Sequence, residues 1–416
     1  MKMIKTLLLG CVATLSVTAQ ADAIMIRDAS VHTMTGDGVL ENTDVFIAEG
    51  KIQRIGKNLP VPKADVRVFE AGGKPLTPGF FAGVTAIGIS EVPAVEESTD
   101  ASLALKAMHP EFDVVPAYNP NSSLIPVTRI EGFSFTLLGP DTEGSIFGGQ
   151  GRMVRLDGAY ESFLGSPVLF INVGRDASSL SGGSRAAQWM LLNQALQEAD
   201  SPPVSTETAL LTRAGRGTLS AFVNAGKVVF NVDRASDILE TIRFAEKYGF
   251  DLVISGGAEA WMVARELAAA KVPVLLNPLA NLPANFDILG ARLNNAAMLE
   301  AAGVVIAISS GESHNARKQR QMAGNAVSYG LPHAEGIAAL TVNPANIFGV
   351  ADRQGSIRKD MPANVVLWSG DPLEVTSAAE VVVIDGQLIP MESRQTKLRD
   401  RYLPKNPAMP RAYIKP

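Results

Sequence analysis

The segment SSGESHN, residues 309–315, concentrates side chains that could do chemistry. Glu312 and His314 stand two positions apart, a spacing that turns both side chains to one side of an extended chain, where they could grip one metal ion. Asp233, after the apolar run KVVFNV, is the best candidate for a third ligand. Such a metal would activate a water molecule, and Glu312 or Asp233 could take its proton.

The positions of these residues depend on the strands that precede them. Between residues 78 and 349, apolar runs alternate with amphipathic stretches, and the runs include PVLFINVG, KVVFNV, DLVISG, VPVLLNP and VVIAISS. This alternation predicts a parallel sheet covered by helices on both faces. The number of units favours a TIM-like (β/α)8 barrel, whose working groups stand after the C-terminal ends of the strands. An open, doubly wound sheet is the alternative, although its glycine-rich fingerprint is absent.

Two segments outside the predicted barrel have a different pattern of apolar and polar residues. Short apolar alternations punctuated by Gly and Asp occupy residues 24–76 and return at 356–392, which predicts antiparallel strands pairing into one small β-sandwich domain. The barrel then spans residues 77–355. The polar, proline-spotted stretch 393–416 is expected to be an extended tail lying on the surface.

Residues 1–23 begin with basic residues, continue with a short apolar run and end with small residues. This pattern predicts a secretory signal peptide and a periplasmic protein. Lipid attachment at Cys11, within LLGC, is the alternative. No later window predicts a membrane span. Cys11 is the only cysteine, so no disulfide framework is expected.

The composition describes a well-buried globular chain. Of the 416 residues, 46% are hydrophobic and 19% charged, and the formal net charge is −5. This balance offers no broad attraction to nucleic acid or to anionic lipid. Neither partner is therefore indicated by the average charge.

The segment LTPGFFAGVTAIG, which opens the predicted barrel, resembles the amidohydrolase superfamily and especially its imidazolonepropionase-like branch. Members carry Pro-Gly-Phe here, as at residues 78–80, followed by a His-x-His pair. The runs GSIFGGQGRMVRLDG, GNAVSYGLPHAEGIAALTVNPANIFGV and GSIRKDMPANVVLWSGDP also resemble this branch. The resemblance covers nearly the whole chain after residue 23. It implies a barrel with a composite β domain and metal-dependent hydrolysis of non-peptide carbon-nitrogen bonds.

The resemblance fails at the metal ligands. The positions of the family's histidines and catalytic aspartate fall on Val84, Ala86, Asn231, Gly256 and Gly311, or on Glu312 if the register differs by one. None of these residues is a histidine. No bound metal or other cofactor is therefore expected, unless zinc is held by a rebuilt site. His32, His109 and His333 are interpreted as structural or surface residues.

We therefore expect a degenerate, metal-free member, a pseudoenzyme that keeps a role in binding a small molecule or a partner. An active hydrolase of cyclic amides or small peptide derivatives, with a rearranged site around Asp233, Glu312 and His314, is the alternative. A related intact paralogue could be the partner. Arg185 and Arg234 could bind a carboxylate in the cavity. The predicted pocket comprises Val84, Ala86, Asn231, Asp233, Gly256, Gly311, Glu312, His314 and Arg317.

Overall fold

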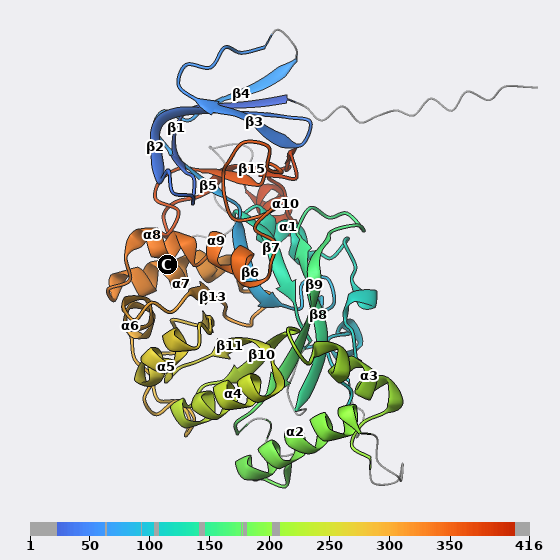
Figure 1. Ribbon diagram of the computed structural model, residues 1–416. Coiled ribbons are helices and arrows are strands. Elements are labelled where there is room, and N and C mark those ends of the chain that lie inside the picture. Colours follow the sequence, from blue (N-terminus) through green and yellow to red (C-terminus); the bar gives the residue numbers. More distant parts are fainter. Residues whose placement is uncertain are drawn as a thin grey trace, which may run out of the picture.

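The computed structural model describes residues 23–62, 65–92, 94–103, 108–140, 146–175, 177, 181–201 and 209–403 (Figure 1). Residues 1–22 of the predicted signal peptide lie outside the described residues, as do residues 404–416 of the predicted tail. Among the helices of the described chain, none is both long enough and apolar enough to cross a membrane.

The secondary structure follows the expected alternation. The strands are β1 (Ala23–His32), β2 (Val39–Ala48), β3 (Lys51–Gly56), β4 (Val66–Glu70), β5 (Pro75–Pro78), β6 (Phe80–Thr85), β7 (Phe133–Leu138), β8 (Phe147–Arg155), β9 (Phe163–Asn172), β10 (Lys227–Val232), β11 (Asp251–Gly256), β12 (Val274–Leu276), β13 (Ile306–Ile308), β14 (Val365–Trp368), β15 (Ala379–Ile384) and β16 (Gln387–Leu388). The α-helices are α1 (Leu124–Arg129), α2 (Arg185–Asp200), α3 (Arg213–Phe222), α4 (Ala235–Tyr248), α5 (Ala264–Ala269), α6 (Asn295–Ala301), α7 (Gln319–Ser328), α8 (His333–Ala338), α9 (Val342–Ile347) and α10 (Arg394–Tyr402).

The first sheet joins two distant parts of the chain. Its strand order is β16-β15-β14-β5-β1-β2-β3, and β4 also pairs with β1, in the parallel direction (Figure 1). The junction is the antiparallel pair β5 and β14, where Trp368 Nε1 donates a hydrogen bond of 2.8 Å to Thr77 Oγ1 across 291 positions of sequence. The fully buried Trp368 ring also stacks on Phe80 at 5.0 Å between centroids, so it joins this sheet to the first barrel strand.

The second sheet is the nearly closed barrel, with the order β6-β7-β8-β9-β10-β11-β12-β13. The predicted α/β class with a TIM-like barrel and a separate β domain is confirmed. The domain boundaries themselves remain predictions. Only residue 79 separates β5 from β6, so the composite sheet adjoins the end of the barrel at which β6 begins.

One barrel strand departs from the all-parallel expectation. β8 runs antiparallel to both β7 and β9, while the other neighbouring pairs are parallel. The connections explain this difference, because residues 139–146 and 156–162 are too few for a crossover, which needs a dozen or more. Hairpin connections therefore reverse the third strand.

Side chains alternate between the two faces of the barrel sheet. In β10, Val228 and Phe230 pack outward in one apolar cluster with residues of α4, while Val229 joins a second cluster. This second cluster takes residues from all eight barrel strands and from α9, so it fills the barrel interior. The period of two residues thus fixes which side chain of each strand faces inward.

The barrel closes through side chains. Between β6 and the segment after β13, Val84 N donates to Ser309 Oγ at 3.0 Å and Ala86 N donates to Ser313 Oγ at 2.8 Å. Below them, Gln319 Nε2 donates to Ala82 O. We refer to these three hydrogen bonds as the barrel seam.

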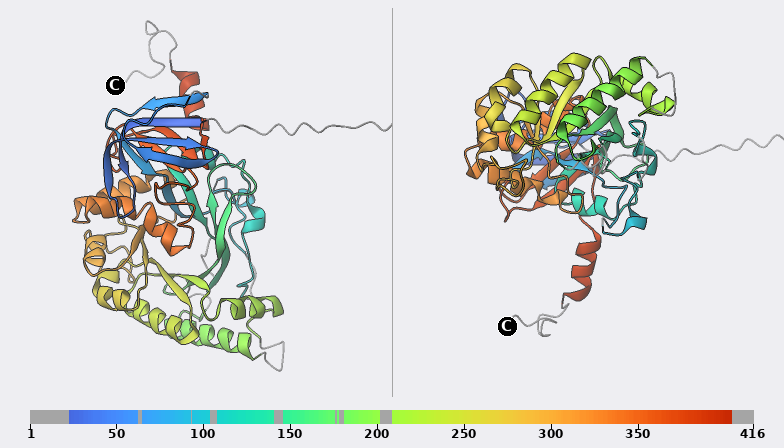
Figure 2. Two further views of the ribbon diagram at one scale, coloured as in Figure 1. Left: turned by 45° about the horizontal axis from the view of Figure 1, so that its top comes forward. Right: turned by 90° about the horizontal axis from the view of Figure 1, so that it is seen from below.

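The expectation of an extended tail is wrong for residues 394–402. They form α10, which begins with a capping box: Ser393 Oγ accepts from Thr396 N, and Thr396 Oγ1 accepts from Ser393 N at 2.8 Å. Figure 2 shows that α10 projects away from the rest of the molecule.

Candidate functional site

A cavity of about 560 Å³ opens at the C-terminal ends of the parallel barrel strands. Since the composite sheet adjoins the opposite end, the cavity lies away from it. Eight of the nine predicted pocket residues line this cavity: Val84, Ala86, Asn231, Asp233, Gly256, Gly311, Glu312 and His314. Arg317 is not among its lining residues, and its Nη1 instead donates to His314 O at 2.5 Å.

The inner faces of five successive strands end in small polar side chains. In β9 to β13 the last inward-facing apolar residues are Phe170, Val229, Val253, Leu275 and Ala307. Two positions later stand Asn172, Asn231 and Ser255 at the ends of their strands, and Asn277 and Ser309 directly after β12 and β13. We call these five residues the polar ring. Because side chains along a strand alternate between its two faces, a residue two positions further on also faces the barrel interior.

One member of the polar ring, Asn231, is also a position that the resemblance matches to a metal ligand. All its members except Asn172 line the main cavity. Asn172 lines an adjoining cavity of about 250 Å³, and Asn231 Nδ2 donates to Asn172 Oδ1 at 2.7 Å. Each amide offers both donors and an acceptor, and each hydroxyl offers both kinds of group. The ring can therefore bind uncharged polar groups of either kind.

The two cavities share Asn231, Asp233, Ser255 and Gly256 in their walls. Asp233 follows β10, and its Oδ1 accepts a hydrogen bond of 3.0 Å from Ala258 N in the loop after β11. This carboxylate is thus positioned by the neighbouring strand connection. Gly256 keeps the space beside it open, because a Cβ there would lie 2.7 Å from Asp233 Oδ1.

Glu312 and His314 are linked through Asn315 on the other side of the cavity. Asn315 Nδ2 donates to Glu312 Oε2 at 2.7 Å and contacts His314 Nε2 at 3.0 Å. Because an amide NH2 can only donate, the second contact requires an unprotonated Nε2. Both Glu312 and His314 are exposed to solvent at the cavity wall.

The donors around the cavity do not fit a zinc ion. Four of the five positions matched to metal ligands have no side-chain donor: Val84, Ala86, Gly256 and Gly311. Zinc sites use at least three nitrogen, sulfur or carboxylate ligands from the protein. Over the described part of the chain, no group of three or more His, Cys, Asp and Glu side chains is placed to hold a metal ion.

The other histidines lie away from this cavity. His109 Nδ1 contacts Glu111 Oε1 at 3.1 Å, and Thr212 Oγ1, at the cap of α3, donates to the same carboxylate at 2.5 Å. Burial acts to raise the pKa of Glu111, but these hydrogen bonds outweigh it and leave that pKa below its usual value. His333 Nε2 contacts Asp371 at 2.9 Å.

Neither proposed carboxylate-binding arginine lines the cavity. Arg185, at the start of α2, donates to Asp237 Oδ2 of α4 at 2.7 Å and to Asp287 Oδ1 in the loop after β12. Asp287 also accepts from Arg175 N at 2.8 Å. Arg185 therefore ties three elements together around the adjoining cavity. Arg234 is exposed before α4.

Three of the polar ring residues in the main cavity wall were not among the predicted site residues: Ser255, Asn277 and Ser309. Their signal is present in the sequence. Each is the first polar residue after an apolar strand, in DLVIS, VPVLLN and VVIAIS. The first polar residue after each predicted strand is thus the signal that identifies Ser255, Asn277 and Ser309.

Comparisons with known proteins agree with this architecture. A family model described as the amidohydrolase family matches residues 309–390. The crystal structure of an amidohydrolase from Thermotoga maritima MSB8 is similar, with a TM-score of 0.78 and 26% identity over 88% of this chain and 99% of that one. An adenosine deaminase from Xanthomonas campestris with bound zinc shares the fold, with a TM-score of 0.54 and 16% identity over 92% and 98% of the two chains.

A curated relative is the amidohydrolase tasK of Hapsidospora irregularis, 22% identical over 387 residues. The match covers 82% of this chain but only 39% of that protein, so the chain spans well under half the length of this relative. The matched family model, this relative and the Thermotoga structure lead to one assignment. Together these findings support the amidohydrolase superfamily as the family of this chain.

Proposed function

We propose that this protein binds a small, uncharged polar molecule in the barrel cavity and does not carry out the zinc-dependent hydrolysis typical of its superfamily. The observation that carries the proposal is the polar ring, in which side-chain amides and hydroxyls stand at the ends of five strands. Such groups form hydrogen bonds to a ligand at modest desolvation cost. A cavity of about 560 Å³ lies within the range of small-molecule sites.

The loss of metal ligands supports the same proposal. Zinc chemistry of this kind needs a metal that makes bound water acidic near neutral pH. A base such as Glu312 has little to act on without it. The cavity therefore serves recognition, with the barrel as a rigid frame that positions the ring.

The first test is elemental analysis of the untagged protein purified without chelator, combined with native mass spectrometry. We expect well under one zinc, iron or manganese per chain. About one metal ion per chain, together with hydrolysis of a carbon-nitrogen substrate, would sink the proposal.

Binding is tested by a thermal-shift screen of sugars, amides and amino acids, followed by calorimetry on hits. Asn231→Leu replaces a ring amide with an apolar side chain of similar size, and we expect affinity to fall about tenfold, because one lost hydrogen bond is worth up to about 1.5 kcal/mol. Asn346→Leu is the matched control, since Asn346 is exposed on α9 away from the cavity. Equal losses in both variants would contradict a site at the ring.

An active hydrolase with a rearranged site is the second candidate, favoured by one observation. Asp233, Glu312 and His314 all line the same cavity. If the protein turns over a cyclic amide or a small peptide derivative, Glu312→Ala and His314→Ala should each reduce kcat at least a hundredfold. Unchanged turnover in both variants would exclude this site.

Two further proposals concern where and with whom the protein acts. We place it in the periplasm because of the signal-peptide pattern in residues 1–23, which cell fractionation tests. A related intact amidohydrolase is a candidate partner, because this chain keeps the barrel fold without the matched metal ligands. Co-purification with a chromosomally encoded paralogue would support it.

A further inference from the structure

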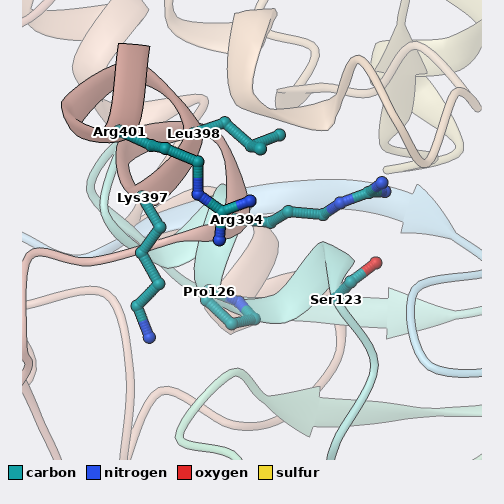
Figure 3. Close-up of a pocket in the computed structure, with 6 residues that line it drawn as sticks. All are labelled: Ser123, Pro126, Arg394, Lys397, Leu398 and Arg401. Atoms are coloured by element: carbon teal, nitrogen blue, oxygen red, sulfur yellow. The ribbon is translucent and has the colours of Figure 1, made fainter. Parts of the chain in front are cut away.

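A second cavity, of about 520 Å³, lies between α10 and the start of α1 (Figure 3). It is independent of the barrel cavity. Its walls are Ser123 and Pro126 from α1 and its cap, and Arg394, Lys397, Leu398 and Arg401 from α10. Positions 394, 397, 398 and 401 follow the i, i+3, i+4, i+7 spacing of one helix face. Three cations therefore share this face, and we call it the basic face.

The basic face is poorly compensated by acidic groups. Arg394 and Arg401 make no side-chain hydrogen bond or ion pair within the described residues. Lys397 pairs with Glu392 at 3.3 Å, but both side chains are more than 60% exposed, which makes the pair weak. Ser123 is already engaged, because its hydroxyl donates to Glu91 at 3.0 Å. Like charges spaced three and four residues apart destabilise a helix. An external anion would relieve this repulsion.

The charge of the whole sequence is polarised toward this element. Residues 393–416 hold seven of the 37 Lys and Arg residues and one of the 42 acidic residues, so they carry +6 while the remainder carries −11. The seven are Arg394, Lys397, Arg399, Arg401, Lys405, Arg411 and Lys415. A polyanion is therefore attracted to this segment and repelled by the rest.

We propose that α10, through its basic face, docks the protein on an anionic phospholipid surface. Guanidinium groups bind phosphate in a bidentate manner. The cations extend about 10 Å along a helix, at 1.5 Å per residue, which suits several headgroups better than one small anion. Exposed apolar side chains accompany them, with Tyr402 69% and Leu403 54% exposed. The helix projects from the molecule, so a flat surface can reach it (Figure 2).

Flotation of the full chain with vesicles tests this docking. We expect binding to phosphatidylcholine vesicles that contain phosphatidylglycerol, little binding to phosphatidylcholine alone, and release at about 0.5 M salt. The triple variant Arg394→Gln, Lys397→Gln, Arg401→Gln should bind about 100-fold more weakly, at about 1 kcal/mol for each cation near the surface.

The matched control is Arg213→Gln, Arg265→Gln, Lys271→Gln, which removes the same charge from exposed positions elsewhere. It should bind as the unaltered protein does. Equal weakening in both triple variants, or no binding of the unaltered protein to anionic vesicles, would overturn the proposal. Binding of soluble pyrophosphate at the basic face without any vesicle binding would also overturn it and assign a soluble anion instead. Circular dichroism of each variant verifies that it is folded.

Discussion

Ser309 takes part both in the barrel seam and in the polar ring. Its hydroxyl accepts from Val84 N, and it also belongs to the polar ring that lines the cavity. The seam thus holds the backbone of β6 at the position where the family's histidine pair would stand. A serine directly after the last strand thus takes the place of part of the β6 to β13 backbone pairing that would close a regular barrel.

Replacing Ser309 by alanine should lower the free energy of unfolding by about 1 to 2 kcal/mol, because the amide of Val84 loses its acceptor in a site that is only 7% exposed at Ser309. Urea unfolding measures the change. Ser310→Ala is the control, since Ser310 Oγ accepts only an exposed 3.2 Å hydrogen bond from Glu312 N. A Ser309→Ala change no larger than that of the control would show that the seam does not depend on this hydroxyl.

His32, at the end of β1, makes the stability depend on pH. Burial lowers its pKa from the ordinary value of 6.5, the charge of His333 lowers it further, and Glu41 and Asp371 act in the opposite direction. The unfolded chain therefore binds a proton at a higher pH than the folded chain does. This contribution to stability is present above pH 6.5 and is lost as the pH falls below it toward the folded pKa.

We expect His32→Asn to flatten the decline in unfolding free energy below pH 6.5, measured by urea unfolding across that range. His314→Asn, at a position exposed to solvent, serves as the control and should keep the decline. If the His32→Asn profile follows that of the unaltered protein, other groups set the acid sensitivity.

At the scale of elements, the pattern of apolar runs predicted β9 to β13 because each strand is buried on both faces and reads as a continuous apolar segment. The reversal of β8 could not be read in this way, since strand direction depends on the length of the connections around Gly139 and Leu156. The helix α10 escaped prediction for another reason. Its sequence RQTKLRDRY has no apolar periodicity, and its capping box uses Thr396 in place of Glu or Gln.

The shared cavity of residues 84, 231, 256 and 311 was predictable, because parallel strands bring their C-terminal ends together. The hydrogen bonds among these elements were not. Whether Asn231 bonds to Asn172, or Ser313 to Ala86, depends on register and rotamer, which a single sequence does not specify. Arg317 was predicted to line the cavity, but its guanidinium instead donates to His314 O.

Arg185 joins α2, α4 and the loop after β12, and its removal should be costly. Arg185→Ala leaves Asp237 and Asp287 without their cation at 9% and 8% exposure, so we expect a loss of about 2 to 3 kcal/mol. Hydrogen exchange should accelerate in the loop around Asp287 more than in α5. Arg243→Ala, which breaks an exposed pair with Glu240, should cost under about 0.5 kcal/mol. Similar losses in both variants would argue against this junction.

At the scale of the whole molecule, the net charge of −5 conceals a strong polarity. The average charge predicts no attraction to anionic lipid. The charges are separated, however, because residues 393–416 carry +6 and the remaining residues carry −11, and this separation favours docking on anionic lipid with α10 toward the surface. An average over 416 residues cannot report such a separation, and only the position of Arg394 to Arg401 on one projecting helix makes it meaningful.

A metal that binds only the folded state would stabilise it by mass action. Because the donors do not fit zinc, we expect a chelator to leave the melting temperature unchanged within about 1 °C. Differential scanning calorimetry with and without EDTA measures this. A fall of several degrees that added zinc restores would indicate a rebuilt metal site, with Asp233, Glu312 and His314 as its candidate ligands.

The pairing of β5 with β14 also determines the order in which the molecule can form. Thr77 and Trp368 are 291 positions apart, so during synthesis β1 to β5 are complete long before their neighbour exists. Contacts of such separation form slowly, and the barrel between them must first bring the two segments together. Until then the edge of β5 is unpaired and open to association with other chains. Nascent chains that end before about residue 368 therefore expose this edge to other chains.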